Sequence, residues 1–132
     1  MLIAKGNDEP AAKTEVVDIK SATSSADIKL ITKEYFKKTP VMAEIARCES
    51  TYNQFSSNGN VLRGKVNSAD VGVMQINEKY HLKRSQELGM DIHTLEGNLA
   101  YGKYLYEEQG SRPWNASKPC WGKPATVVAV NN

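Results

Sequence analysis

The chain has 132 residues, 40% of them hydrophobic, which is the size of one globular domain with a packed core. Its 17 basic and 15 acidic side chains leave a net charge of +2, too little to indicate the dense basic patch of a nucleic-acid-binding protein. The longest apolar runs span only a few residues, as at 127–130, so we expect no membrane span.

Residues 1–27 are predicted to form a flexible leader, because large apolar side chains are scarce from residue 5 onward and follow no regular period. The apolar start at 1–4 is too short for a secretory signal. From Ile28 apolar side chains recur at helical spacing, with Asp27 as the predicted N-cap. Thr39-Pro40 ends this helix and begins a second, which is predicted to run to about Glu49.

The middle of the chain alternates between turn-forming and apolar segments. Residues 51–60 are a polar turn region, and 61–65 and 71–76 are predicted as two extended segments of a small hairpin around 67–70. Helical spacing returns over 78–88 and 91–109, and each stretch ends at a glycine. The core face of the last helix is predicted to contain Ile92, Leu95, Leu99 and Leu105, with Gly97 and Gly102 allowing close packing. The predicted class is α+β, mostly helical with a short β-hairpin, followed by an irregular closing segment that holds both tryptophans.

Glu49 is the first candidate for chemistry. Val41, Ile45 and Cys48 place an apolar face on the second helix, and Glu49 lies at the edge of that face in the last turn. Partial burial and the negative end of the helix dipole both raise the pKa of such a carboxyl group. An acid that keeps its proton near neutral pH can protonate the leaving oxygen of a glycosidic bond. The alternative is a glutamate that only reaches solvent or caps the helix end.

Three short motifs strengthen the first interpretation. They are Glu49-Ser50 at a helix end, Gly72-Val73-Met74-Gln75 about two dozen residues later, and Asn98-Leu99-Ala100 at the start of a helix. In this order and spacing they resemble the transglycosylase SLT-like branch of the lysozyme superfamily. The resemblance covers residues 28–122 and implies a small lysozyme-like domain there, which leaves 123–132 as a C-terminal tail.

The resemblance implies that Glu49 is the general acid and that neighbouring residues line a substrate groove. Gly72 would let the backbone approach a sugar, Met74 would form an adaptable apolar wall, and Gln75 would hydrogen-bond an acetamido group. Alternatively, the same segment is a buried hairpin strand. The expected substrate-binding residues are Ser50, Gly72, Met74, Gln75, Asn77 and Tyr101.

Tyr101 enters this set because the chain departs from the family pattern. Many members carry an Ala-Tyr-Asn-Ala-Gly stretch whose tyrosine contacts the catalytic acid. The nearest stretch here is Trp114-Asn115-Ala116-Ser117, in which tryptophan has no phenol. Tyr101 directly follows the Asn-Leu-Ala motif and is the candidate replacement, although a tyrosine at helical spacing more often packs in a core.

The type of reaction depends on a second carboxylate. Asp70 is the best candidate, but an aspartate is also an ordinary turn residue. Without a second acid, the lytic route is favoured, in which the bond between N-acetylmuramic acid and N-acetylglucosamine is cleaved to give an anhydro-sugar end. The alternatives are a lysozyme-type hydrolase and a catalytically inactive glycan-binding module.

Cys48 and Cys120 are the two cysteines. A disulfide between them would tie the closing segment over the catalytic helix and would fit an extracytoplasmic enzyme of the cell wall; the alternative is two free thiols. His81 and His93 lack zinc-ligand spacing and are interpreted as helix-surface residues. We therefore expect no metal and no cofactor, peptidoglycan glycan strands as the partner, and a monomer.

Overall fold

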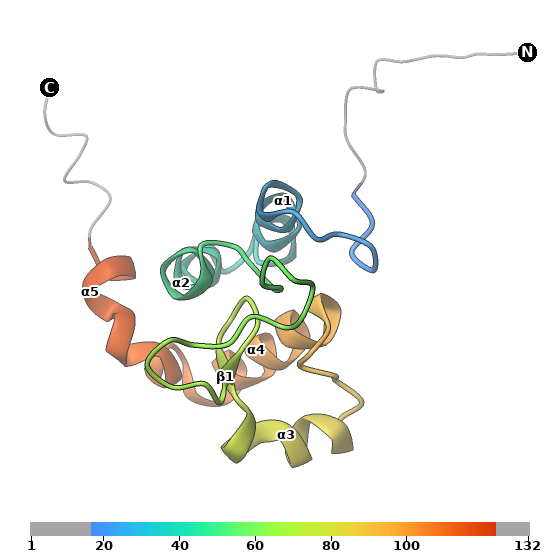
Figure 1. The fold of residues 1–132 in the computed structure, drawn as a ribbon. Coiled ribbons are helices and arrows are strands. Elements are labelled where there is room, and N and C mark those ends of the chain that lie inside the picture. Colours follow the sequence, from blue (N-terminus) through green and yellow to red (C-terminus); the bar gives the residue numbers. More distant parts are fainter. Residues whose placement is uncertain (1–16, 124–132) are drawn as a thin grey trace, which may run out of the picture.

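The computed structural model describes residues 17–123, which form an α+β domain dominated by helices (Figure 1). This confirms the predicted class. The predictions for residues 1–16 and 124–132 lie outside the described residues. The described elements are α1 (Ser25–Tyr35), α2 (Pro40–Ser50), β1 (Asp70–Val71), β2 (Ile76–Asn77), α3 (Glu78–Glu87), α4 (Leu95–Gln109), the 3-10 helix η2 (Arg112–Ser117) and α5 (Lys118–Trp121).

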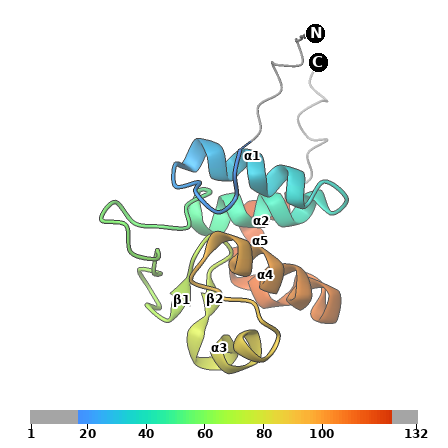
Figure 2. The same ribbon diagram turned by 90° about the vertical axis from the view of Figure 1, so that its right-hand side faces the viewer.

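The elements surround one core, and α4 runs through the middle of the molecule (Figure 2). On one side of it lie α1 and α2, packed against each other, and on the other side lie the hairpin and α3. The closing elements η2 and α5 return to α2 (Figure 1). Within residues 17–123 no helix combines the length and the apolar character needed to cross a membrane.

The first two helices follow the predicted pattern with two shifts. The N-cap of α1 is Ser24, whose side chain accepts a hydrogen bond from the Asp27 amide, so the predicted cap at Asp27 is wrong by one turn. The chain before residue 27 also joins the core, because Ala22 is buried. Pro40 begins α2 as predicted. Its inward face centres on Ile45, with fully buried neighbours, while Val41 and Cys48 are only half-buried.

The hairpin lies further along the chain than predicted. Its two strands are both within the segment 70–77, with Val71 opposite Ile76, and the turn is formed by residues 72–75. Gly72 adopts φ +77°, a left-handed conformation that suits glycine and reverses the chain. Residues 61–65 therefore do not form a strand of their own and contribute only single bridges, such as Arg63 with Val71.

The last long helix and its core face agree with the prediction except at its start. Thr94 caps α4 by accepting a hydrogen bond from the Gly97 amide, so the helix begins at Leu95 and not near residue 91. A Cβ at Gly97 would come within 1.9 Å of the Asp91 carbonyl oxygen, which shows how closely the preceding loop packs on the helix. The predicted core residues are all buried, namely Ile92, Leu95, Leu99 and Leu105.

The closing segment is helical, whereas the sequence predicted an irregular segment. Cys120 forms a disulfide with Cys48, as predicted, and this bond holds α5 beside the end of α2. Trp114 is buried, and its indole Nε1 donates a hydrogen bond of 2.9 Å to the Met74 carbonyl in the hairpin turn. The closing segment thus joins the two sides of the molecule.

Candidate active site

Glu49 is half-buried in the last turn of α2, directly after the disulfide-bonded Cys48. Its Oε2 accepts a hydrogen bond of 2.7 Å from the Ser117 hydroxyl, at the end of η2. Trp121 on α5 donates from Nε1 to the same Ser117 oxygen over 2.9 Å. The carboxyl group is thus held by a short chain of polar groups from the closing segment.

The surroundings of Glu49 favour its protonated form. Burial is the main cause and raises its pKa above the ordinary value of 4.5. The negative charge of Asp70 raises the pKa further, while the hydrogen bond from Ser117 lowers it without cancelling the effect of burial. The direction of the shift agrees with the one expected from the sequence.

Two adjoining hollows, which we call the groove, meet at Glu49. The first has a volume of about 490 Å³ and extends toward Tyr80 on α3. The second has a volume of about 610 Å³ and extends toward Lys65 in the loop before the hairpin. The residues that line both hollows are Glu49, Asp70, Gln75 and Ala116. The sequence-predicted acid therefore faces open space of a size that can accept a ligand.

The hairpin turn beside the groove is fixed from behind by two fully buried amide side chains. Gln54 accepts a hydrogen bond of 2.8 Å from the Val73 amide, and Asn98 accepts one of 2.8 Å from the Met74 amide. Asn98 also donates to the carbonyl oxygens of residues 71 and 92. The remaining amides of the turn, at 72 and 75, donate to the carbonyl oxygens of residues 62 and 72. All four N–H groups of the turn are therefore engaged within the protein.

Five predicted site residues lie together at the groove, namely Glu49, Ser50, Asp70, Gln75 and Asn77. Asn77 donates from Nδ2 to Asp70 Oδ1 over 3.1 Å, and so orients the candidate second acid. Gln75 donates from Nε2 to the Gly72 carbonyl over 2.9 Å. The hydroxyl of Ser50 is directed to the helix, where it donates to the Ala46 carbonyl, so it is less available to a ligand.

Gly72 and Met74 do not have the predicted roles. Met74 is fully buried and packs near Gly102 of α4, so it cannot form a wall of the groove. Gly72 is also buried: a Cβ there would lie 2.3 Å from Asn98 Nδ2, so glycine makes room for the buried amides and not for a sugar. In both cases the alternative noted from the sequence, a buried hairpin segment, is the one observed.

Tyr101 likewise does not have its predicted role, which was to contact Glu49. It is only 1% exposed, and its hydroxyl lies 2.8 Å from His81 Nδ1. His81 is half-buried, which lowers its pKa, and is not the exposed residue that was expected. Sequence reasoning missed Ser117, although it ends the Trp-Asn-Ala-Ser stretch identified as nearest to the family's tyrosine motif. The motif indicates a phenol at this position, whereas here the hydroxyl of a serine contacts Glu49.

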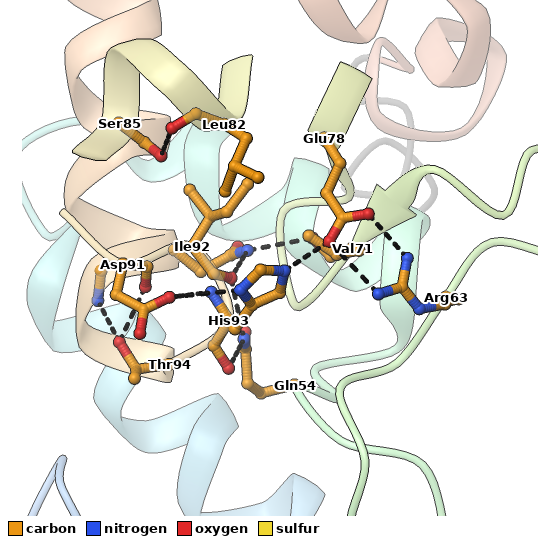
Figure 3. A network of polar contacts seen from close by, with 12 residues as sticks. Gln54, Arg63, Val71, Glu78, Leu82, Ser85, Asp91, Ile92, His93 and Thr94 are labelled. Carbon is orange, nitrogen blue, oxygen red and sulfur yellow. Dashed lines mark hydrogen bonds and ion pairs between the residues drawn. The ribbon is translucent and has the colours of Figure 1, made fainter. Parts of the chain in front are cut away.

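A network of charged residues supports the hairpin on the side of α3 (Figure 3). Arg63 donates to both carboxylate oxygens of Glu78, over 2.9 and 3.2 Å, and His93 contacts the same carboxylate. The hydrogen bond from Arg63 is the main reason that the pKa of Glu78 falls to about 2, and the contact with His93 adds to it. The network ties the loop before the hairpin to the start of α3 and to the loop that leads to α4.

The arrangement can supply a proton to a ligand in the groove, since it combines a half-buried acid of raised pKa with a nearby carboxylate and an amide side chain. Among residues 17–123 no group of three or more His, Cys, Asp or Glu side chains is placed to hold a metal ion. Comparison of the chain with protein-family models, with curated proteins and with solved structures gave no match.

Proposed function

We propose that this protein is a peptidoglycan lytic transglycosylase with a lysozyme-like domain. The reaction is cleavage of the β-1,4 bond between N-acetylmuramic acid and N-acetylglucosamine, with Glu49 as the acid and then the base. One observation carries the proposal: Glu49 faces the groove, and its burial raises its pKa. The three motifs that resemble the transglycosylase SLT-like family support the same assignment.

In the first step, protonated Glu49 gives its proton to the glycosidic oxygen while the bond from that oxygen to the muramic acid C1 breaks. The positive charge that develops at C1 is stabilised by the substrate's own acetamido oxygen. In the second step, the Glu49 carboxylate takes the proton of the muramic acid 6-hydroxyl, whose oxygen bonds to C1. Glu49 ends in its protonated form, and the products are an anhydro-sugar end and a free 4-hydroxyl.

A lysozyme-type hydrolase is the second candidate, because Asp70 lines the same two hollows as Glu49. One carboxylate oxygen of Asp70 accepts a hydrogen bond from Asn77, and this orientation would suit a group that assists water or C1 directly. The hydrolytic product is heavier than the anhydro product by one water. Mass spectrometry of the products of defined muramyl oligomers therefore separates the two reactions.

The test of the enzymatic proposal is Glu49→Gln, with Glu44→Gln as the matched control. Glu44 is on the same helix, is partly exposed and pairs with Arg47. We expect Glu49→Gln to lower the rate of cell-wall clearing by about 100-fold or more, because general acid catalysis contributes at least that much. Glu44→Gln should clear walls at the wild-type rate. Equal and negligible clearing by all three proteins would favour the inactive glycan-binding module.

The two routes also differ in their need for Asp70. In the lytic route, the substrate's own acetamido group stabilises the positive charge at C1. Asp70→Asn should therefore keep most of the anhydro-forming activity. A hydrolase would lose activity by orders of magnitude with the same substitution. The disulfide between Cys48 and Cys120 supports an extracytoplasmic location, where such bonds form and persist.

A further inference from the structure

Glu49 lies within a row of hollows and not at the end of one. The two hollows of the groove share Glu49 and Asp70, and each continues away from them along different elements. A third hollow, of about 790 Å³, shares Asn53 and Leu62 with the second and continues to Ser24 at the start of α1. Open space is therefore present on both sides of the acid.

The side chains on the two sides suit a sugar polymer. Toward α3, the hollow is lined by Tyr80, which is 80% exposed and offers an aromatic face that the core does not use. Toward the loop before the hairpin, the hollow is lined by Lys65 and by Val66, which is fully exposed. Arg63 in the same loop is paired with Glu78, whereas Lys65 forms no ion pair within residues 17–123. The ammonium group of Lys65 can form an ion pair with the carboxylates of muramyl residues.

From this arrangement we infer that the groove binds an interior stretch of a glycan strand, with saccharides on both sides of Glu49, so that the enzyme cuts within strands and does not release units from an end. The inference rests on the proposed function for its substrate class. It goes further by stating where on the polymer the protein binds, which a single acid in a groove does not determine.

The number of protein molecules bound per strand tests this independently of catalysis. Uncross-linked glycan strands of defined lengths are titrated with Glu49→Gln, and the bound ratio at saturation is measured by analytical ultracentrifugation. We expect the ratio to rise in proportion to strand length. A constant ratio of one or two molecules per strand would mean binding at the ends, and this result, or an absence of binding, would overturn the inference.

Variants in the Glu49→Gln background locate the contact with the polymer. Tyr80→Ala should weaken binding about fivefold, because stacking on an aromatic ring is lost, while Tyr80→Phe should bind like the parent. Leu30→Ala is the control, since Leu30 is another exposed large hydrophobic residue but lines none of the three hollows. Equal affinity of Tyr80→Ala and its parent would contradict binding on the α3 side of Glu49.

Products of the wild-type enzyme complete the experiment. Early in the reaction with long strands, we expect fragments of intermediate length; disaccharides alone from the first time point would contradict cutting within strands. If strands bind in proportion to their length but no product forms, the proposed enzymatic function is wrong and the interior binding site stands. The two hypotheses can therefore fail separately.

Discussion

Removal of the Ser117 hydroxyl should move the pH dependence of the reaction. In the variant Ser117→Ala, the carboxylate of Glu49 loses a hydrogen bond of 2.7 Å, while its burial and the nearby charge of Asp70 remain. This hydrogen bond lowers the pKa of Glu49, so its loss raises that pKa. Glu49, the proposed general acid, then keeps its proton to higher pH, and the descending limb of the pH–rate profile shifts to higher pH.

The size of the shift follows from the type of hydrogen bond. A bond to a charged group contributes about 1.5 to 3 kcal/mol, and the lower figure applies because Glu49 is only half-buried. A difference of about 1.4 kcal/mol corresponds to one pH unit, so we expect the limb to move by about one unit. Trp121 donates a hydrogen bond to the Ser117 oxygen, which makes the Ser117 hydroxyl a stronger donor to Glu49. Trp121→Phe should therefore give a smaller shift in the same direction.

The assay is the rate of product formation, as kcat/KM, measured on a soluble muramyl oligomer from acidic to basic pH. Ser117→Thr retains a hydroxyl and should keep the wild-type profile. The thermal unfolding of each variant, recorded at each pH, separates a change in the acid from a loss of folded protein. A uniform loss of activity with an unmoved limb, or a limb shifted downward, would refute the role assigned to Ser117.

Three further substitutions test other parts of the structure. Cys120→Ser should lower the free energy of unfolding by about 4 kcal/mol, because the disulfide joins residues 72 positions apart; denaturant titration with and without reductant measures this, and a wild-type protein insensitive to reductant would contradict it. Asn98→Ala should cost roughly 3 kcal/mol in the same titration, since it leaves the Met74 amide and the Val71 carbonyl without their buried partner; a cost below about 1 kcal/mol, within the range of an ordinary hydrogen bond, would contradict this role. Glu78→Gln should be less stable than wild type above the ordinary glutamate pKa of 4.5, with the difference disappearing as the pH falls toward about 2, because the lowered pKa stabilises the fold only while the carboxylate is charged. Melting temperatures across this range test it, and a difference that does not change with pH would argue against the ion pair.

Local signals in the sequence predicted the four longer helices, α1 to α4, but not the short helices η2 and α5. Thr39-Pro40 fixed the start of α2, and a glycine followed the end of α4 as predicted. The position of the hairpin was not predictable in the same way. Residues 61–65 have a strand-like composition, but the turn at 72–75 is held by Gln54 and Asn98, which lie far from it in the sequence. No local pattern shows such a contact.

The same distinction applies to the site. The environment of Glu49 was predictable because its burial follows from its place on an amphipathic helix. Its partner Ser117 is 68 residues away and is brought near by the disulfide and the short helices that follow α4. The prediction for Tyr101 was wrong because its side chain is buried in the core. Whether a tyrosine on α4 faces the groove or the core depends on how the helices pack, which the local sequence does not show.

The saturated backbone of the hairpin turn limits how this protein can recognise a ligand. Since the four amides of residues 72–75 already have acceptors inside the protein, they are not available to a bound sugar. At this turn, recognition then depends on side chains that line the groove, such as Gln75, Asn77 and Tyr80. Exchanges at the exposed Tyr80 can change ligand preference while the scaffold stays intact. Asn77 is less free to change, because its side chain also caps α3 by accepting a hydrogen bond from the Tyr80 amide.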